Sequence, residues 1–78
     1  MAKKVTVYST PVCPYCVRAK QFLKDNSINF EDIDVSVDPL RANEMIEKSG
    51  QMGVPVLDIE GDIIIGFDTQ RIKKALSL

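Results

Sequence analysis

The fold is decided by residues 4–16, which read KVTVYSTPVCPYC. The first half of this stretch alternates apolar with polar residues and is rich in β-branched side chains, a pattern that predicts a strand over 4–9. Residues 10–12 then form a turn. A helix is predicted from Pro14, because a proline at the first helical position lacks only an N–H that would have no partner there. The two cysteines therefore lie where a strand gives way to a helix.

The rest of the chain predicts two further helices and three further strands. The first helix ends at 25–27, and a strand over 29–35 and a helix from Asp38 to Gly50 follow. Two strands over 54–59 and 62–65 then flank a Glu60-Gly61 turn, and the last helix opens at 67–69. Two strands joined by a helix are expected to run parallel, and the hairpin adds antiparallel strands to the same sheet. The sequence thus predicts an α/β fold of order β-α-β-α-β-β-α, with a four-stranded mixed sheet flanked by three helices. Three successive isoleucines at 63–65 predict a last strand that is covered on both faces.

Length and composition limit the class of protein. A chain of 78 residues predicts a single domain over 1–78. Its share of apolar residues, 45%, is typical of a globular protein and excludes an intrinsically disordered one. No apolar run approaches the roughly 20 residues that span a bilayer. Residues 1–5 also lack the features of a secretory signal, so we expect a cytoplasmic protein without membrane contact, in a compartment where structural disulfides are rare.

The charges are unevenly distributed along the chain, although the net charge is only −1. Residues 1–24 contain five cations and no acid, whereas residues 25–68 contain all eleven acids. Because the basic segment includes both cysteines, its charge favours a thiolate there. The excess is too small, and too far from forming a basic stripe, to predict a nucleic-acid partner.

The two cysteines have four candidate roles. A structural zinc site needs four ligands, and a chain with no third cysteine and no histidine would have to recruit carboxylates. A structural disulfide between residues three apart closes a very short loop and removes little entropy from the unfolded chain. A packing role fits Cys16, on the apolar face of the predicted helix, but does not explain Cys13. A redox couple explains both, and a Cys-x-x-Cys beside a βαβ pattern is typical of one.

The spacing of the cysteines assigns them different parts in redox chemistry. Cys13 is predicted at the helix start, where free backbone N–H groups and the positive end of the helix dipole stabilise an anion. Cys16 is one turn further on along the same face and more buried. It can attack a mixed disulfide formed on Cys13 without movement of the helix. Cys13 is therefore the predicted nucleophile and Cys16 the predicted resolving thiol.

Three separated segments resemble the glutaredoxins, small members of the thioredoxin-fold family. They are Cys-Pro-Tyr-Cys at 13–16, Gly-Val-Pro-Val at 53–56 and Ile-Gly-Phe-Asp-Thr at 65–69. The resemblance implies a thioredoxin-like fold, a monomer, and reduction of protein disulfides and glutathione mixed disulfides. Glutathione would be the co-substrate, the partners of the protein would be glutathionylated or disulfide-bonded proteins, and no metal would be required.

The resemblance also assigns roles within a glutathione groove. Val54 would offer its backbone N–H and C=O to the cysteinyl part of glutathione, as an added strand does. Pro55 would be cis and keep that edge close to Cys13. Asp68 and Thr69 would open the last helix, whose N–H groups hold a carboxylate, and Asp68 would also pair with the γ-glutamyl ammonium. The other residues placed at the site are Thr10 and Pro14, which shape it, and Tyr15, Gln51 and Gly66, which line the groove.

Three departures from the family pattern leave alternatives open. Thr10 stands where many glutaredoxins carry a lysine, Ile65 replaces the first of two glycines, and Thr69 replaces an acid. Gln51 would compensate by contacting the glycyl end of glutathione. The first alternative is a redoxin recharged by thioredoxin reductase, which donates electrons to ribonucleotide reductase. The second is a carrier in which two Cys13 thiolates and two glutathiones hold a [2Fe–2S] cluster across a dimer.

Overall fold

The computed structural model describes residues 4–78 and contains the predicted elements in the predicted order. The strands are β1 (Val5–Ser9), β2 (Glu31–Asp34), β3 (Val56–Ile59) and β4 (Asp62–Ile65), and the helices are α1 (Pro14–Asp25), α2 (Pro39–Ser49) and α3 (Thr69–Leu76). Lys3, one of the cations counted in the basic segment, lies outside the described residues. Across residues 4–78, no helix combines the length and the apolar character needed to cross a membrane.

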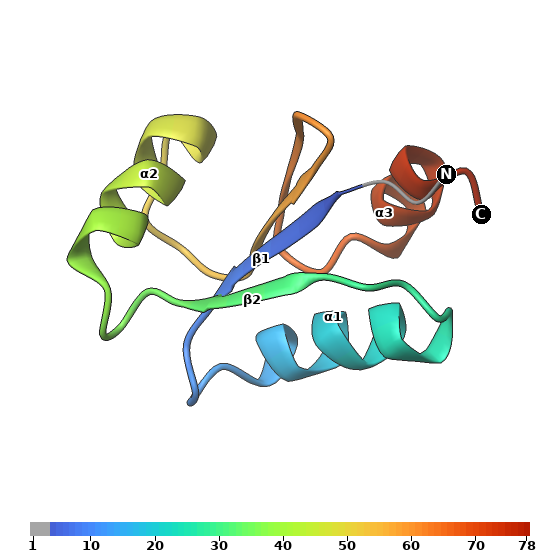
Figure 1. The fold of residues 1–78 in the computed structure, drawn as a ribbon, viewed down its shortest axis with the longest axis horizontal. Coiled ribbons are helices and arrows are strands. Elements are labelled where there is room, and N and C mark those ends of the chain that lie inside the picture. Colours follow the sequence, from blue (N-terminus) through green and yellow to red (C-terminus); the bar gives the residue numbers. More distant parts are fainter. Residues whose placement is uncertain (1–3) are drawn as a thin grey trace.

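The sheet has the order β2-β1-β3-β4 and is mixed, as predicted. β1 pairs with β2 in parallel, while β3 runs antiparallel to both β1 and β4. In Figure 1, α1 lies on one side of β1 and β2 and α2 lies on the other. Every residue of β1 is buried, because this central strand is covered on both faces. Its carboxyl end leads directly into the segment that carries the cysteines.

Two apolar cores lie on opposite faces of the sheet. The larger core joins α1 and α3 to the sheet and consists of Val5, Val7, Ala19, Leu23, Leu57, Ile59, Ile64 and Ile72. The smaller core lies under α2 and consists of Tyr8, Ile33, Met45 and Val56. The alternation of side chains along β1 and β3 sends successive residues to opposite cores, as the pleat requires.

The prediction that β4 is covered on both faces is confirmed only in part, because Ile63 packs against the smaller core and Ile64 against the larger one, while Ile65 is largely uncovered. Ile64 is 1% exposed, but Ile65 is 48% exposed. The reason is the strand order, which places β4 at the edge of the sheet, where α2 and α3 cover it only in part. The second strand is also shorter than predicted. Phe30 and Val35 lie outside it, although both still pack against the cores.

Helix boundaries follow the capping residues seen in the sequence. Asp38 caps α2 by accepting a hydrogen bond from the backbone N–H of Arg41 at 3.2 Å, and Asp68 caps α3 by accepting one from Arg71, also at 3.2 Å. Gly50 ends α2 with φ 74°, a left-handed conformation that glycine adopts without steric cost. These caps confirm both predicted limits of α2 and the predicted start of α3.

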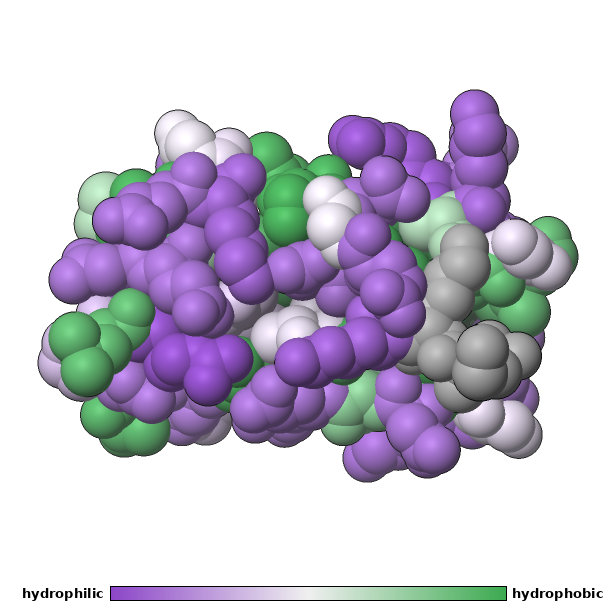
Figure 2. Space-filling model, turned by 45° about the horizontal axis from the view of Figure 1, so that its top comes forward, coloured by the Kyte–Doolittle hydropathy of each residue, from purple (hydrophilic) through white to green (hydrophobic). Residues whose placement is uncertain are grey.

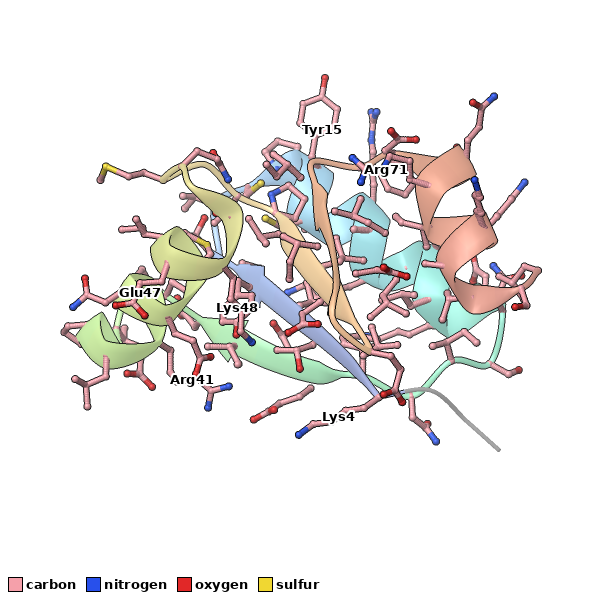
Figure 3. All side chains as sticks on the ribbon, turned by 90° about the horizontal axis from the view of Figure 1, so that it is seen from above. Lys4, Tyr15, Arg41, Glu47, Lys48 and Arg71 are labelled. Carbon is pink, nitrogen blue, oxygen red and sulfur yellow. The ribbon has the colours of Figure 1, made fainter. Side chains whose placement is uncertain are left out.

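The sheet face beneath α2 carries a network of charged side chains. The ammonium of Lys48 donates hydrogen bonds to Asp58 at 2.7 Å and to the hydroxyl of Tyr8 at 2.9 Å. The buried Tyr8 in turn donates to Glu44, which also accepts from Arg41 at 3.0 Å. Figure 3 shows Lys48 and Arg41 extending from α2 toward the strands, and Figure 2 shows that this side of the molecule is mainly hydrophilic. These charges satisfy one another and hold α2 against the sheet.

This network predicts that stability falls in acid. Burial raises the pKa of Asp58, but the hydrogen bond from Lys48, the N–H of Gly61 and nearby cations together lower it below its ordinary value. A depressed carboxyl pKa adds stability above the unfolded value of about 3.9, and this is lost as pH falls through the folded pKa. We expect Asp58→Asn to cost about 1 kcal/mol or less at pH 7 and to flatten the loss of stability below about pH 4.

The measurement is the free energy of unfolding in urea at pH 7 and pH 3. Asp62→Asn is the matched control, because it removes an exposed carboxylate from the neighbouring strand. An identical pH dependence in the two variants would show that the Lys48–Asp58 pair does not stabilise the fold.

Candidate active site

The sulfur of Cys13 caps α1. Cys13 has an extended backbone (φ −101°, ψ 110°) and its Sγ accepts a hydrogen bond from the backbone N–H of Cys16 at 3.2 Å. Pro14 is the first residue of the helix, as predicted, and is exposed. Because α1 begins at this point, its unpaired N–H groups and the positive end of its dipole favour negative charge on the sulfur. Cys13 is half-buried and therefore remains within reach of another molecule.

Cys16 lies behind Cys13 and is fully buried. Burial and, to a smaller extent, the contact with Cys13 together raise the pKa of its thiol to about 11. A backbone hydrogen bond from Thr10 and the positive charge of Lys20 oppose this rise in pKa. The thiol of Cys16 is thus protonated near neutral pH and shielded from solvent. The two sulfurs are chemically distinct, with the accessible one placed at the helix terminus.

Thr10 contributes to the site through its backbone. Its carbonyl oxygen accepts a hydrogen bond from the N–H of Cys13 at 3.4 Å, and its own backbone makes the hydrogen bond that lowers the pKa of Cys16. The turn after β1 therefore holds both cysteines. No contact of the Thr10 side chain is needed for this.

The segment before β3 brings an open stretch of backbone to the nucleophile. The Val54–Pro55 peptide bond is cis, as the family resemblance implies, and Pro55 is fully buried. The carbonyl oxygen of Val54 lies 3.8 Å from the Sγ of Cys13. Within residues 4–78, no group pairs with the N–H of Val54. Val54 therefore presents both a donor and an acceptor beside the reactive sulfur.

Gln51 braces the loop that leads to Val54. Its side-chain amide nitrogen donates to the carbonyl of Gly53 at 3.0 Å, and its amide oxygen accepts from the N–H of Gly53 at 2.5 Å. The hydroxyl of Ser49 contacts the same amide nitrogen at 3.4 Å. Both polar ends of the Gln51 side chain are thus occupied within its own loop.

The segment from Gly66 to Thr69 is attached to the cis-proline segment. Gly66 donates its N–H to the carbonyl of Pro55 at 2.8 Å and has φ 81°, a conformation that side chains rarely allow. Asp68 then caps α3, and Thr69 is the first helical residue. In the described part of the chain, the N–H groups of Thr69 and Gln70 have no partner. The start of α3 therefore offers free donors next to the segment that carries Val54.

Tyr15 lies at the outer surface of the site. Tyr15 is 58% exposed, and Figure 3 shows its ring pointing away from the body of the molecule. The guanidinium of Arg18 lies 5.7 Å from the centre of this ring, within the range of a cation–π interaction. Tyr15 therefore borders the site at the surface and is not packed into it.

Sequence reasoning missed a polar cluster behind Cys16. Lys20 donates hydrogen bonds to Asp32 at 3.1 Å and to the hydroxyl of Ser9 at 3.4 Å. The helical pattern that begins at Pro14 puts Ala19 and Leu23 on the apolar face and Lys20 off it, so the pattern alone predicts no contact for Lys20 with the sheet. The sequence does contain one indication that Lys20 lies near Cys16. Residues four apart lie on the same side of a helix, and Lys20 is four residues beyond Cys16.

The described residues contain no group of three or more histidine, cysteine, aspartate or glutamate side chains that could hold a metal ion. Two cavities, of about 410 Å³ beside β4 and α3 and about 310 Å³ on the charged face under α2, are lined by other residues than the cysteines. The reactive centre is instead a surface site formed by three chain segments around Cys13.

Comparison with known proteins gives consistent results. The family model described as Glutaredoxin matches residues 5–64. An uncharacterized glutaredoxin-like 8.6 kDa protein in the rubredoxin operon of Clostridium pasteurianum is 43% identical, covering 92% of this chain and 96% of that protein. The crystal structure of the thioredoxin-like protein BC3987 superposes with a TM-score of 0.87 at 32% identity, covering 92% and 99% of the two chains.

A further structural neighbour is the glutaredoxin-like protein NrdH-redoxin from Escherichia coli, which is described as having a thioredoxin-like activity profile. It superposes with a TM-score of 0.80 at 25% identity, covering 91% of this chain and 92% of that one. The range matched by the family model includes both cysteines and Pro55, whereas the segment from Gly66 to Thr69 lies beyond it.

Proposed function

The chain belongs to the glutaredoxin family and has its thioredoxin-like fold, and from this premise we propose that it is a glutathione-dependent thiol–disulfide oxidoreductase with Cys13 and Cys16 as the redox couple. Membership of the family implies thiol oxidoreductase chemistry. The observation that carries the assignment of roles is the position of the Cys13 sulfur, which caps α1 while Cys16 is buried directly behind it.

The proposed cycle has two steps. The thiolate of Cys13 attacks one sulfur of a substrate disulfide, so that a mixed disulfide forms and the other substrate sulfur leaves as a thiolate. The thiolate of Cys16 then attacks the Cys13 sulfur, the intramolecular disulfide forms, and the remaining substrate sulfur is released. The substrate has gained two electrons and two protons, and the protein is oxidised.

Glutathione is the proposed source of electrons for the return to the dithiol. The unpaired N–H of Val54, beside its carbonyl, suits the backbone of the cysteinyl residue of glutathione. The free donors at the start of α3 suit a carboxylate, and Asp68 suits the γ-glutamyl ammonium. Val54 lies beside Cys13, and the segment before α3 is joined to Pro55 through Gly66, so a glutathione bound to these groups would place its sulfur at the nucleophile. Glutathionylated proteins are the corresponding substrates.

A second candidate donor is thioredoxin reductase, with ribonucleotide reductase as the partner that receives the electrons. Two features of the site favour it. Thr10 brings no cation where many glutaredoxins have a lysine, and the amide of Gln51 is occupied within its own loop and so is not free for the glycyl end of glutathione. The resemblance to NrdH-redoxin, with its thioredoxin-like activity profile, agrees with this alternative.

The test is a direct comparison of the two donors. The oxidised protein is mixed with NADPH, glutathione and glutathione reductase in one cuvette, and with NADPH and thioredoxin reductase in another. We expect NADPH to be oxidised faster in the first cuvette, because the open backbone of Val54 and the start of α3 offer unpaired hydrogen-bonding groups to glutathione. Cys13→Ser is the control for both. Fast turnover only in the second cuvette would replace glutathione with the second candidate.

A further inference from the structure

Three polar side chains from three different elements meet behind Cys16. Lys20 of α1 lies between Ser9, the last residue of β1, and Asp32 of β2, and the hydroxyl of Ser9 also donates to Asp32 at 2.9 Å. The three groups thus form a closed set of contacts. Ser9 is 2% exposed, so this cluster is built into the fold on the face of the sheet that otherwise packs apolar residues against α1.

The cluster fixes where the charge of Lys20 is located. A lysine side chain is long and flexible, and on a solvated helix face its ammonium would be free to move. Here the side chain is only 21% exposed, and its ammonium contacts Asp32 at 3.1 Å. Because Lys20 is one helical turn beyond Cys16, this arrangement keeps a cation close to the buried sulfur.

We propose that Lys20, held by Asp32 and Ser9, is a positioning residue for the resolving step, in which it stabilises the thiolate that the buried Cys16 must form. This inference rests on the proposed dithiol function. In this proposal the cation of the redox site comes from α1 and acts on the resolving sulfur. The family pattern would instead supply a lysine at position 10, before the nucleophile.

The step that Lys20 assists is the attack of Cys16 on the mixed disulfide. The electron pair of the Cys16 thiolate forms a bond to the Cys13 sulfur, and the bond between Cys13 and the substrate sulfur breaks. The substrate sulfur leaves with that electron pair and takes up the proton that Cys16 released to solvent. Cys16 is oxidised as it joins the disulfide, Cys13 exchanges one disulfide partner for another, and the substrate sulfur is reduced to a thiol.

The groups that face Cys16 show why a cation matters there. These groups are Cys13 at the start of α1, Lys20 within α1 and the backbone of Thr10 in the turn after β1. Asp32 of β2 acts through Lys20, with which its charge is paired. The segment before β3 reaches the site through Val54, which carries no charge. Lys20 therefore supplies the positive charge that opposes burial.

Whether Cys13 is free or in the mixed disulfide determines the pH range in which the charge of Lys20 affects Cys16. Burial and the contacts with Cys13 raise the pKa of Cys16, while Lys20 lowers it. In the mixed disulfide Cys13 bears no charge, so its contribution to that rise is lost. The influence of Lys20 on the pKa then remains, and the titration of Cys16 falls closer to neutral pH.

Stopped-flow reaction with the aromatic disulfide 5,5′-dithiobis(2-nitrobenzoate) separates the two sulfurs. The first thionitrobenzoate is released when Cys13 attacks the reagent, and the second is released when Cys16 resolves the mixed disulfide. Lys20→Met keeps most of the side-chain stem and removes the charge. Lys20→Arg keeps the charge, and Lys24→Met removes an exposed cation from the same helix as a matched control.

We expect Lys20→Met to move the pH midpoint of the second phase upward by about one pH unit, the effect of losing one nearby opposite charge. At pH 7 the second phase should slow by about threefold, since the more basic thiolate is also the better nucleophile. The first phase should change by less than about twofold, Lys20→Arg should restore the midpoint, and Lys24→Met should behave as the wild type.

An unshifted midpoint in Lys20→Met would overturn the proposal. So would equal slowing of both phases together with a lower melting temperature, because Lys20 would then act only by joining α1 to β2. The proposed function fails separately. A wild-type protein that releases thionitrobenzoate without any second phase would have no resolving thiol, whatever the effect of Lys20.

Discussion

Replacement of Cys13 with serine is expected to reduce turnover of every disulfide substrate to the uncatalysed rate. A serine hydroxyl is not ionised near neutral pH and forms no mixed disulfide, so neither step of the cycle can begin. The fold should survive, because serine is one of the preferred residues at a helix N-cap, the position that Cys13 occupies. Loss of activity in a fully folded variant would therefore report the chemistry of the sulfur alone.

Cys16→Ser is the matched comparison, and its effect depends on the substrate. Reduction of a protein disulfide should stop, because the mixed disulfide on Cys13 can no longer be resolved from within. Reduction of a glutathionylated peptide should continue, because a second glutathione can release Cys13. The two rates are measured with glutathione and glutathione reductase. Full activity of both serine variants with both substrates would show that the roles of Cys13 and Cys16 are wrongly assigned.

The parts of the fold that depend on local chemistry were predictable from the sequence. The caps at Asp38 and Asp68, the left-handed Gly50 and the helix start at Pro14 each follow from the properties of one residue and its neighbours. The same holds for the cysteine pair, because the strand before it and the proline within it are enough to predict that it lies at the start of a helix. The structure confirms the predicted element order and the position of Cys13 at the start of α1.

The environment of β4 depends on strand order, which local patterns do not contain. The isoleucines at 63–65 fit a strand buried on both faces as well as they fit an edge strand with one apolar face. The two possibilities are distinguished only by the strand order, in which β3 lies between β1 and β4. This order places β4 at the edge of the sheet and leaves Ile65 exposed. An apolar run therefore predicted the strand correctly but did not predict its neighbours.

The site shows the same division between local and tertiary information. The family resemblance led correctly to the cis bond before Pro55, which the residues alone would not predict because few X–Pro bonds are cis. The contact of Lys20 with Ser9 and Asp32 joins residues from three elements and follows from the parallel pairing of β1 with β2. Its components were visible in the sequence, but their meeting behind Cys16 was not.

Leu23→Ala is expected to cause the largest loss of stability among the substitutions considered for this protein. Leu23 is fully buried in the core between α1 and the sheet. Removing such a side chain costs about 3–5 kcal/mol through lost burial and the cavity that remains. A domain of this length is stabilised by about 4–12 kcal/mol in total, so the variant should lose a large share of its stability. The measurement is the free energy of unfolding in urea.

Val17→Ala on the same helix is the control, because Val17 is 57% exposed and its truncation should change the stability by less than about 0.5 kcal/mol. Leu23 lies two turns from the cysteines, and the Cys13 sulfur is held by contacts with Cys16, Thr10 and the helix terminus. The folded fraction of Leu23→Ala should therefore react with disulfides at the wild-type rate. A cost no greater than that of Val17→Ala would show that α1 is not anchored through Leu23, and slower chemistry in the folded fraction would show that this core also positions the nucleophile.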